Sequence, residues 1–395
     1  MKTFIETANL LKSIKADDLD NIYREITDKA VEWAVGGYLT YANRLLQDVW
    51  NFHSGDPENV RRQYEGLQIM WELSGNFPSD IPFPFRKIEE IEKENWEELR
   101  LDYLYGGKTV AVVLGQIEGD IQNATGFHYG TLAVGAAILS LQYASTAEGE
   151  KYIHYWGRGY MQDYNYIVGY LTRNSKVSEL LLKGVLASVL ELTEEKCGSE
   201  YEALSAALKD RNGKGRTLIY GDQSWKSLLK NISLLSIEKN PELFSGDVIS
   251  SKWLGNDPAP EENILATEEK IGIQLPADYR EFLKASNGFS AHNYASPNLL
   301  TVQETDWLSV LDSDLVDYVE QILEWNKDKY AQLSKKCLLV SGIHEEEQVL
   351  LFPTSDNGWE CWSLVLPGGC EETWYPSFRY YMEHQLFFLE CRLFS

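Results

Sequence analysis

Apolar residues recur every three or four positions through most of the first 240 residues, which is the spacing of amphipathic helices. The clearest run contains Leu19, Ile22, Ile26, Ala30 and Trp33, and Gly36-Gly37 interrupts it. Further helices are predicted over residues 38–52, 57–73, 86–105, 120–146, 149–172, 177–192, 200–208 and 225–235. The stretch Val110–Gly115 fits either a strand or a buried helix, and its helical surroundings favour a helix.

The pattern changes after Gly288, where short apolar runs replace the helical spacing. The runs at residues 337–342, 348–353 and 359–366 predict strands, with a hairpin turn at Asp356–Gly358 between the last two. A further strand is predicted near Leu300 and Val302, and helices over 314–325 and 378–394. This order of elements indicates an α+β fold with a mainly antiparallel sheet.

Glycine and proline residues interrupt every regular pattern between residues 240 and 260, as is typical of a linker. We therefore predict two domains. Residues 1–240 form an all-α domain of unknown family, 241–255 form the linker, and 256–395 form the α+β domain.

One segment of the second domain has a distinctive order of residues. Pro276 suits the start of a helix, and Tyr279, Phe282 and Leu283 place its apolar face at helical spacing. The ordered set consists of Ile264, Glu268, Ile271, Gly272, Leu275, Pro276, Tyr279, Phe282, Leu283, Asn287 and Gly288. This set resembles the opening of the SUKH superfamily, which includes yeast cell-wall assembly and killer-toxin-resistance regulators and bacterial immunity proteins. Packing alone explains these residues, so they indicate a fold and not a contact site.

The chain carries a formal net charge of −24, of which residues 246–395 contribute −15 and residues 1–245 contribute −9. Such a surface repels nucleic acid and anionic membranes and attracts a basic partner. Solubility alone is the other explanation of this charge.

The sequence contains no recognisable cofactor, metal or catalytic motif. Its five cysteines are scattered, without metal-ligand spacing, and are expected to be reduced core residues of a cytosolic protein. The first 18 residues lack a continuous apolar segment, and the longest apolar run, Thr131–Tyr143, is shorter than the roughly 20 residues of a membrane span. We expect a cytoplasmic protein that is not an enzyme.

Acidic residues gather in or beside the predicted strand connections, namely Glu345, Glu346, Glu347, Asp356, Glu360, Glu371 and Glu372. They are candidates for contact with a basic toxin. Their other interpretation is that they are solvated charges that prevent the strands from pairing with other chains. Alternation places Trp359 and Trp362 on opposite faces of the sheet, so one of them is a second candidate contact unless both pack in the core.

A polar group in the helical domain leaves a different possibility open. His154 and Arg158 are four residues apart and share a helix face near Asp163, among several tyrosines. An enzyme site there is one interpretation, and an internally satisfied helical core is the other.

The resemblance implies an immunity protein that binds and neutralises a toxin, possibly a nuclease, without catalysis. A regulatory scaffold of the cell-wall-regulator type is the alternative.

Overall fold

The architecture comes from a computed structural model of the 395-residue chain. The structure describes residues 6–16, 19–52, 67–76, 108–124, 126–160, 171–324, 336–343, 345–354, 358–365 and 371–391. Two compact units divide the chain, Met1–Thr217 and Leu218–Ser395. This division lies earlier than the predicted linker at 241–255.

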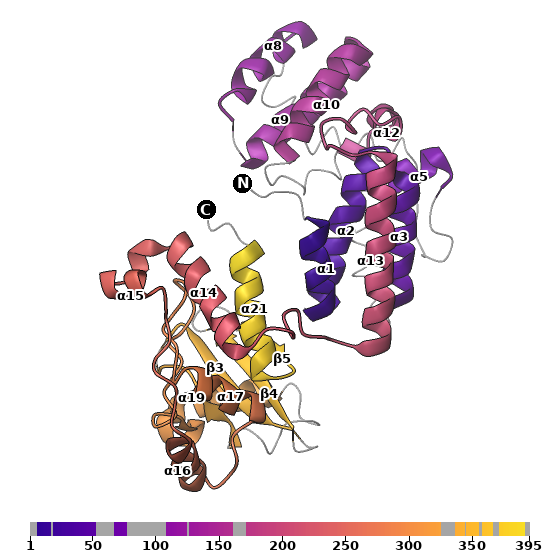
Figure 1. Ribbon diagram of the computed structural model, residues 1–395. Coiled ribbons are helices and arrows are strands. Elements are labelled where there is room, and N and C mark those ends of the chain that lie inside the picture. The colour runs from indigo at the N-terminus through magenta and orange to yellow at the C-terminus, as the bar shows by residue number, and fades with distance from the viewer. Residues whose placement is uncertain are drawn as a thin grey trace. The chain divides into compact units, whose positions relative to one another are not determined.

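The first unit is helical throughout its described part, as predicted (Figure 1). Its helices are α1 (Thr7–Ala16), α2 (Leu19–Val35), α3 (Leu39–Phe52), α5 (Gln68–Ser74), α8 (Val110–Ile121), α9 (Gly126–Tyr143), α10 (Thr146–Tyr160), α12 (Ser175–Leu182) and α13 (Glu194–Lys214). A single apolar core joins them and fully buries Trp33, Trp71 and Trp156. The helical interpretation of Val110–Gly115 is confirmed by α8.

Two glycines end helices of this unit where their backbones approach each other. α2 ends at Val35, as predicted, and Gly37 follows with a φ of +93°. A Cβ atom on Gly37 would lie 2.7 Å from the Cα atom of Gly184, which is too close for any side chain. Gly184 has a φ of +79°, and α12 stops just before it at Leu182. The predicted helix over 177–192 is therefore wrong beyond Leu182, because a tertiary contact turns the chain there.

The predicted helix over 200–208 is only the middle of α13. The Thr193 side chain accepts a hydrogen bond from the backbone N–H of Lys196 and starts the helix at Glu194. The helix then continues to Lys214 and ends at Gly215, six residues beyond the predicted end at Leu208. The predictions for residues 57–66, 86–105, 161–170 and 355–357 lie outside the described residues.

The second unit combines helices with one sheet. Its elements are α14 (Trp225–Lys239), the 3-10 turn η3 (Pro241–Leu243), α15 (Gly246–Ser251), α16 (Glu261–Ile271), α17 (Ala277–Ala285), β1 (Asp306–Trp307), α18 (Leu308–Leu311), α19 (Ser313–Glu324), β2 (Leu338–Leu339), β3 (Glu347–Pro353), β4 (Trp359–Val365), β5 (Glu371–Tyr375) and α21 (Phe378–Cys391). The five strands lie in sequence order, and all neighbours are antiparallel. The predicted α+β fold with an antiparallel sheet is confirmed.

The strand predictions differ from the structure in two places. Leu300 and Val302 lie in no strand, although neighbouring Leu299 makes isolated bridges to Phe289 and Ser341. β5 was not predicted, because two glutamates begin it and shorten its apolar run.

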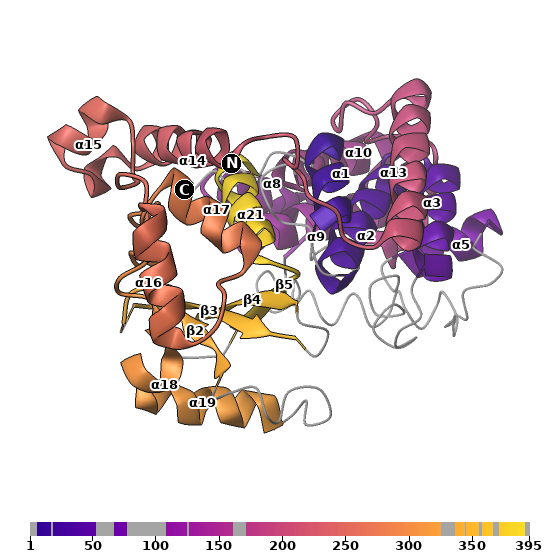
Figure 2. The same cartoon turned by 60° about the horizontal axis from the view of Figure 1, so that its bottom comes forward.

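Helices cover both faces of the sheet, as Figure 2 shows, with α14, α17 and α21 on one side and α18 and α19 on the other. On the first side, alternate strand residues such as Val349, Leu351 and Cys361 share a core with those helices. On the second side, Leu350, Phe352 and Trp362 pack against the inner residues of α18 and α19. We call these the motif face and the outer-helix face.

The family-like residues build the motif face. The Glu268 carboxylate accepts a hydrogen bond from the backbone N–H of Leu275 at 2.8 Å and pairs with Arg280 at 2.5 Å, which fixes the link between α16 and α17. Tyr279 and Phe282 pack on Phe378 of α21, with ring centroids 5.0 Å apart in both pairs. The motif therefore ties two helices to the closing helix.

Residues 218–239 belong to the second unit because of specific contacts with α17 and α21. Trp225 packs against Phe282 and Phe378. The Arg379 guanidinium donates to the backbone oxygens of Tyr220 and Gln223 at 3.0 and 2.9 Å, and it pairs with the buried Glu383. These bonds explain why the division lies at Thr217 and not after α14.

Candidate functional site

The three consecutive glutamates before β3 have three different environments. Glu346 is exposed, and the Glu345 carboxylate accepts a hydrogen bond from the side-chain amide of Asn298 at 2.9 Å. Glu347 is buried, and its carboxylate accepts a hydrogen bond from the Ser363 hydroxyl at 2.5 Å. Burial raises the pKa of Glu347. Within this group, Glu346 is the exposed acid, whereas Glu347 is part of the fold.

The two candidate tryptophans are both used in packing, although to different degrees. Trp362 is fully buried on the outer-helix face, where it stacks on Phe352 with centroids 4.1 Å apart. Trp359 is half-buried and packs against the core of the motif face. Trp362 therefore has no surface to offer a partner while the domain is folded.

The remaining predicted contacts are only partly described. Glu360 is half-buried in β4. Glu371 and Glu372 begin β5, but their side chains, like the whole of Asp356, lie outside the described residues. The predicted acidic residues thus do not form one described surface, and they remain candidates at Glu345, Glu346, Asp356, Glu360, Glu371 and Glu372.

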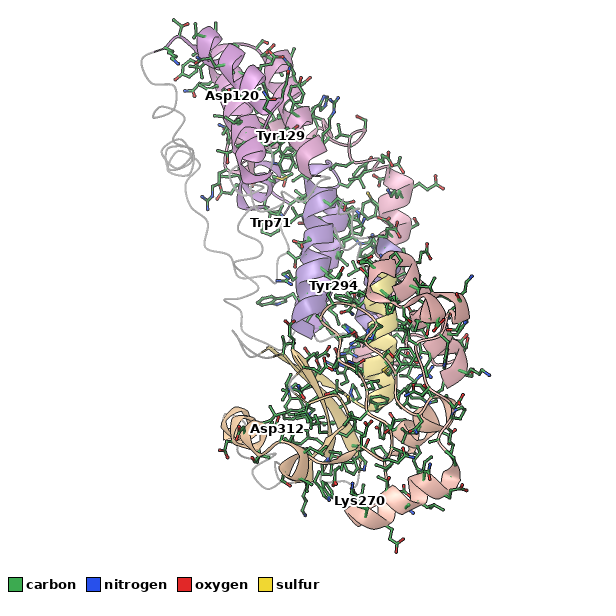
Figure 3. All side chains as sticks on the ribbon, turned by 90° about the vertical axis from the view of Figure 1, so that its left-hand side faces the viewer. Trp71, Asp120, Tyr129, Lys270, Tyr294 and Asp312 are labelled. Atoms are coloured by element: carbon green, nitrogen blue, oxygen red, sulfur yellow. The ribbon has the colours of Figure 1, made fainter. Side chains whose placement is uncertain are left out.

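A second acidic region lies on α18 and α19 and was not among the predicted contacts. The sequence contains no lysine or arginine between Lys284 and Lys327. Asp306 pairs with Lys270 at 2.7 Å, and the Asp312 carboxylate accepts from the backbone N–H of Leu315 at 3.0 Å. Figure 3 labels Asp312 beside these helices and Lys270 on α16. The sequence feature that indicates this region is the long stretch without lysine or arginine, which the predicted contacts did not take into account.

Comparison with known families identifies the second unit. Residues 258–384 match the model of the SMI1 / KNR4 family (SUKH-1). The C-terminal part of the chain carries a SUKH-1 domain. The resemblance inferred from Ile264–Gly288 is thereby confirmed, and it supports a protein of the immunity or cell-wall-regulator type. A search of curated proteins gives no match for the chain.

The SUKH-1 match begins after α14 and α15, although both helices belong to the same compact unit. Residues 218–257 therefore precede the matched region and still contribute to the core of its unit. Trp225 makes this contribution directly, through its packing on the SUKH-1 residues Phe282 and Phe378.

The candidate enzyme site in the helical unit has local packing partners. His154 Nε2 lies 2.9 Å from the backbone oxygen of Val185. The Arg158 guanidinium lies over the ring of Tyr155, 5.9 Å from its centroid. Asp163 lies outside the described residues. His154 is half-buried and Arg158 is exposed, so these are contacts at the edge of the helical core.

Another charged cluster of the helical unit is buried between α2 and α13. Lys29 Nζ lies 3.1 Å from Glu32 and 3.2 Å from Glu200, and the Trp33 indole donates to Glu200 at 3.3 Å. Burial raises the pKa of Glu32. One ammonium group shared by two carboxylates links the two helices, so this cluster has a sufficient structural role.

The described cysteines behave as core residues. Cys197, Cys337 and Cys361 are buried thiols, and burial raises the pKa of Cys197 and of Cys337 to about 12. Across the described ranges, no group of three histidine, cysteine or acidic side chains is arranged to hold a metal ion. Among the helices that the structure describes, none has the length and apolar character needed to cross a bilayer.

Proposed function

We propose that this protein is a cytoplasmic immunity protein that binds and neutralises a cognate toxin through the acidic surface of its SUKH-1 domain. The observation that carries the proposal is the coincidence of a SUKH-1 match with most of the net negative charge of the chain. Neutralisation by binding requires no catalytic group of its own.

The charge distribution supports a basic protein as the partner. Residues 246–395 carry a net charge of −15, and no lysine or arginine occurs between Lys284 and Lys327. Such a surface attracts a positively charged protein over a distance of about 10 Å and speeds its association. A nuclease toxin fits this description, because its active site must be basic to bind phosphates. The same charge disfavours nucleic acid and anionic membrane as partners.

Protection of cells tests the proposal most directly. The full chain is co-expressed with the toxin domain encoded by the adjacent gene, and growth is compared with cells that express the toxin domain alone. We expect restored growth, and a purified complex whose affinity falls as salt is added. A toxin domain that the purified chain does not bind, together with no protection, would contradict the proposal.

A regulatory scaffold is the second candidate function. It is favoured by the helical unit, because 217 residues precede the second unit and lie outside the SUKH-1 match. Gene neighbourhood separates the candidates, since an immunity gene lies beside a toxin gene and a scaffold gene needs no such neighbour. Binding of several cytosolic proteins without protection against a toxin would favour the scaffold.

A further inference from the structure

The helices α18 and α19 have clearly different inner and outer sides. Leu308, Leu315, Val316 and Val319 point inward and pack on the sheet core. On the other side, Asp314 and Asp317 are exposed, and the Val310 side chain is 65% exposed. The inner residues explain why the helices cover the sheet, but they do not explain the composition of the outer side.

The acidic residues near this outer side have unequal structural roles. Asp306 pairs with Lys270 and Asp312 starts α19, so both serve the fold. Asp314 lies in the first turn of α19, where a negative charge is favourable. Asp317 is one turn further on, and no ion pair joins Asp314 or Asp317 to another described residue.

Stability does not account for Asp317 and Val310 together. Aspartate is a poor helix former in the middle of a helix, and two like charges three positions apart repel. Val310 is more exposed than any valine, leucine or isoleucine in the other described ranges. An exposed apolar side chain, close in sequence to exposed carboxylates that have no described ion pair, is the composition of an interface anchor with a charged rim.

We propose that the outer side of α18 and α19 is the surface through which the SUKH-1 domain docks a basic protein. Val310 inserts into an apolar depression of the partner, and Asp314 and Asp317 pair with lysine or arginine side chains around it. The lack of any lysine or arginine between Lys284 and Lys327 gives α18 and α19 a negative charge that suits a basic partner. This inference rests on the proposed function and specifies its contact surface.

A rival surface provides the internal comparison. Tyr294 is 68% exposed, and its hydroxyl donates to Glu242 of η3 at 2.6 Å. Leu243 and Ile249 are exposed in the neighbouring η3 and α15. Lys230 and Lys252 accompany the acids of that region, so its charge does not select a basic partner as that of α18 and α19 does.

Site-specific photo-crosslinking tests the surface in the full-length chain. A photoreactive amino acid replaces Val310, Tyr294 or the 53%-exposed Leu265 of α16, and each protein is mixed with the toxin domain encoded by the adjacent gene. We expect a crosslink from position 310 and none from 294 or 265. Crosslinks from 294 or 265 without one from 310 would overturn the inference and leave the proposed function standing.

Charge reversal provides the quantitative arm. The D314K/D317K variant is expected to lose affinity by about tenfold or more, because both rim charges become repulsive. The matched control is E262K/E269K on α16, which also reverses one acid in a first helical turn and one later acid. The control should lose less than about threefold, since only long-range attraction changes. Equal losses would overturn the inference, and failure of the wild-type chain to bind or protect would overturn it together with the proposed function.

Discussion

The two helical layers that cover the SUKH-1 sheet differ in how their polar groups are used. On the motif face, Glu268 holds the turn before α17, and the Arg379–Glu383 pair fastens residues 220–223. On α18 and α19, the described residues that are buried are apolar, while Asp314 and Asp317 face solvent without a described ion pair. The layer with the recognisable motif uses its polar groups internally, and the layer without a motif leaves them accessible.

This difference separates the residues that identify the family from those that suit a contact. Tyr279, Phe282 and Leu283 are fully buried, so selection for packing is sufficient to explain them. A partner meets exposed atoms, and these differ between proteins that share one fold. The motif therefore predicts the architecture, whereas charge and exposure predict the contact surface.

Truncating the aromatic centre of the motif face is expected to have the largest effect. Phe282 contacts the rings of Trp225, Tyr279 and Phe378. Phe282→Ala should lower the free energy of unfolding of the second unit by about 4 kcal/mol through lost burial and a cavity. Denaturant unfolding measures this loss, with Leu265→Ala as an exposed control. A loss below about 1 kcal/mol would show that the motif face is not the main source of stability.

The buried ion pair on α21 comes next. Arg379→Met leaves the buried Glu383 without the cation of this pair and should cost about 3 kcal/mol, because the hydrogen bond from the Tyr220 backbone N–H does not replace that charge. The double variant Arg379→Met/Glu383→Leu should recover part of this loss. Full stability of the single variant would contradict the assignment of residues 218–225 to the second unit.

The motif face also contains a pH-sensitive contact. His292 is buried and lies 3.0 Å from the side-chain oxygen of Gln385, and burial lowers its pKa from 6.5 to about 4. The pKa of His292 is lower in the folded chain, so the unfolded chain binds the proton more tightly. The contribution of neutral His292 to the free energy of unfolding is therefore complete above about pH 6.5. It falls by up to about 3 kcal/mol as the pH drops through about 4. The stability advantage of the wild type over His292→Gln should therefore shrink over this range, and an advantage that is independent of pH would exclude the contact.

Reversing one charge on the solvent-exposed side of α19 should have the smallest effect on stability. Asp317→Lys is expected to change the free energy of unfolding by less than about 0.5 kcal/mol, because Asp317 is exposed and forms no ion pair with a described residue. Thermal unfolding of this variant and of Glu269→Lys measures the effect. A loss above about 1 kcal/mol would give Asp317 a structural role and remove the contrast between the two helical layers.

Much of the fold was predictable because its elements carry local signals. The spacing of the helical positions predicted α2, α9, α10 and α17, and the apolar runs predicted β3 and β4. The end of α12 was not predictable, because it depends on the approach of Gly184 to Gly37, about 150 residues away in the chain. β5 was missed because Glu371 and Glu372 conceal an alternation that continues with Trp374 and Tyr375.

The candidate site was predicted less well, since exposure depends on tertiary packing. Alternation placed Trp359 and Trp362 on opposite faces of the sheet. It did not show that both faces are buried, because that depends on α21 covering one face and α19 covering the other. The nearly continuous apolar runs of β3 and β4 are typical of a sheet that is covered on both sides, and they could have indicated this. Likewise, Glu346 and Glu347 are the same residue type side by side, and Glu347 is buried because it is the first residue of β3.

Amide hydrogen exchange of the full chain, measured alone and bound to its toxin domain, tests the central claim most directly. We predict that binding slows exchange in α18 and in α19 up to Val319, and leaves exchange in α16 and α17 unchanged. Slower exchange in α16 and α17, with no change in α18 and α19, would contradict the account.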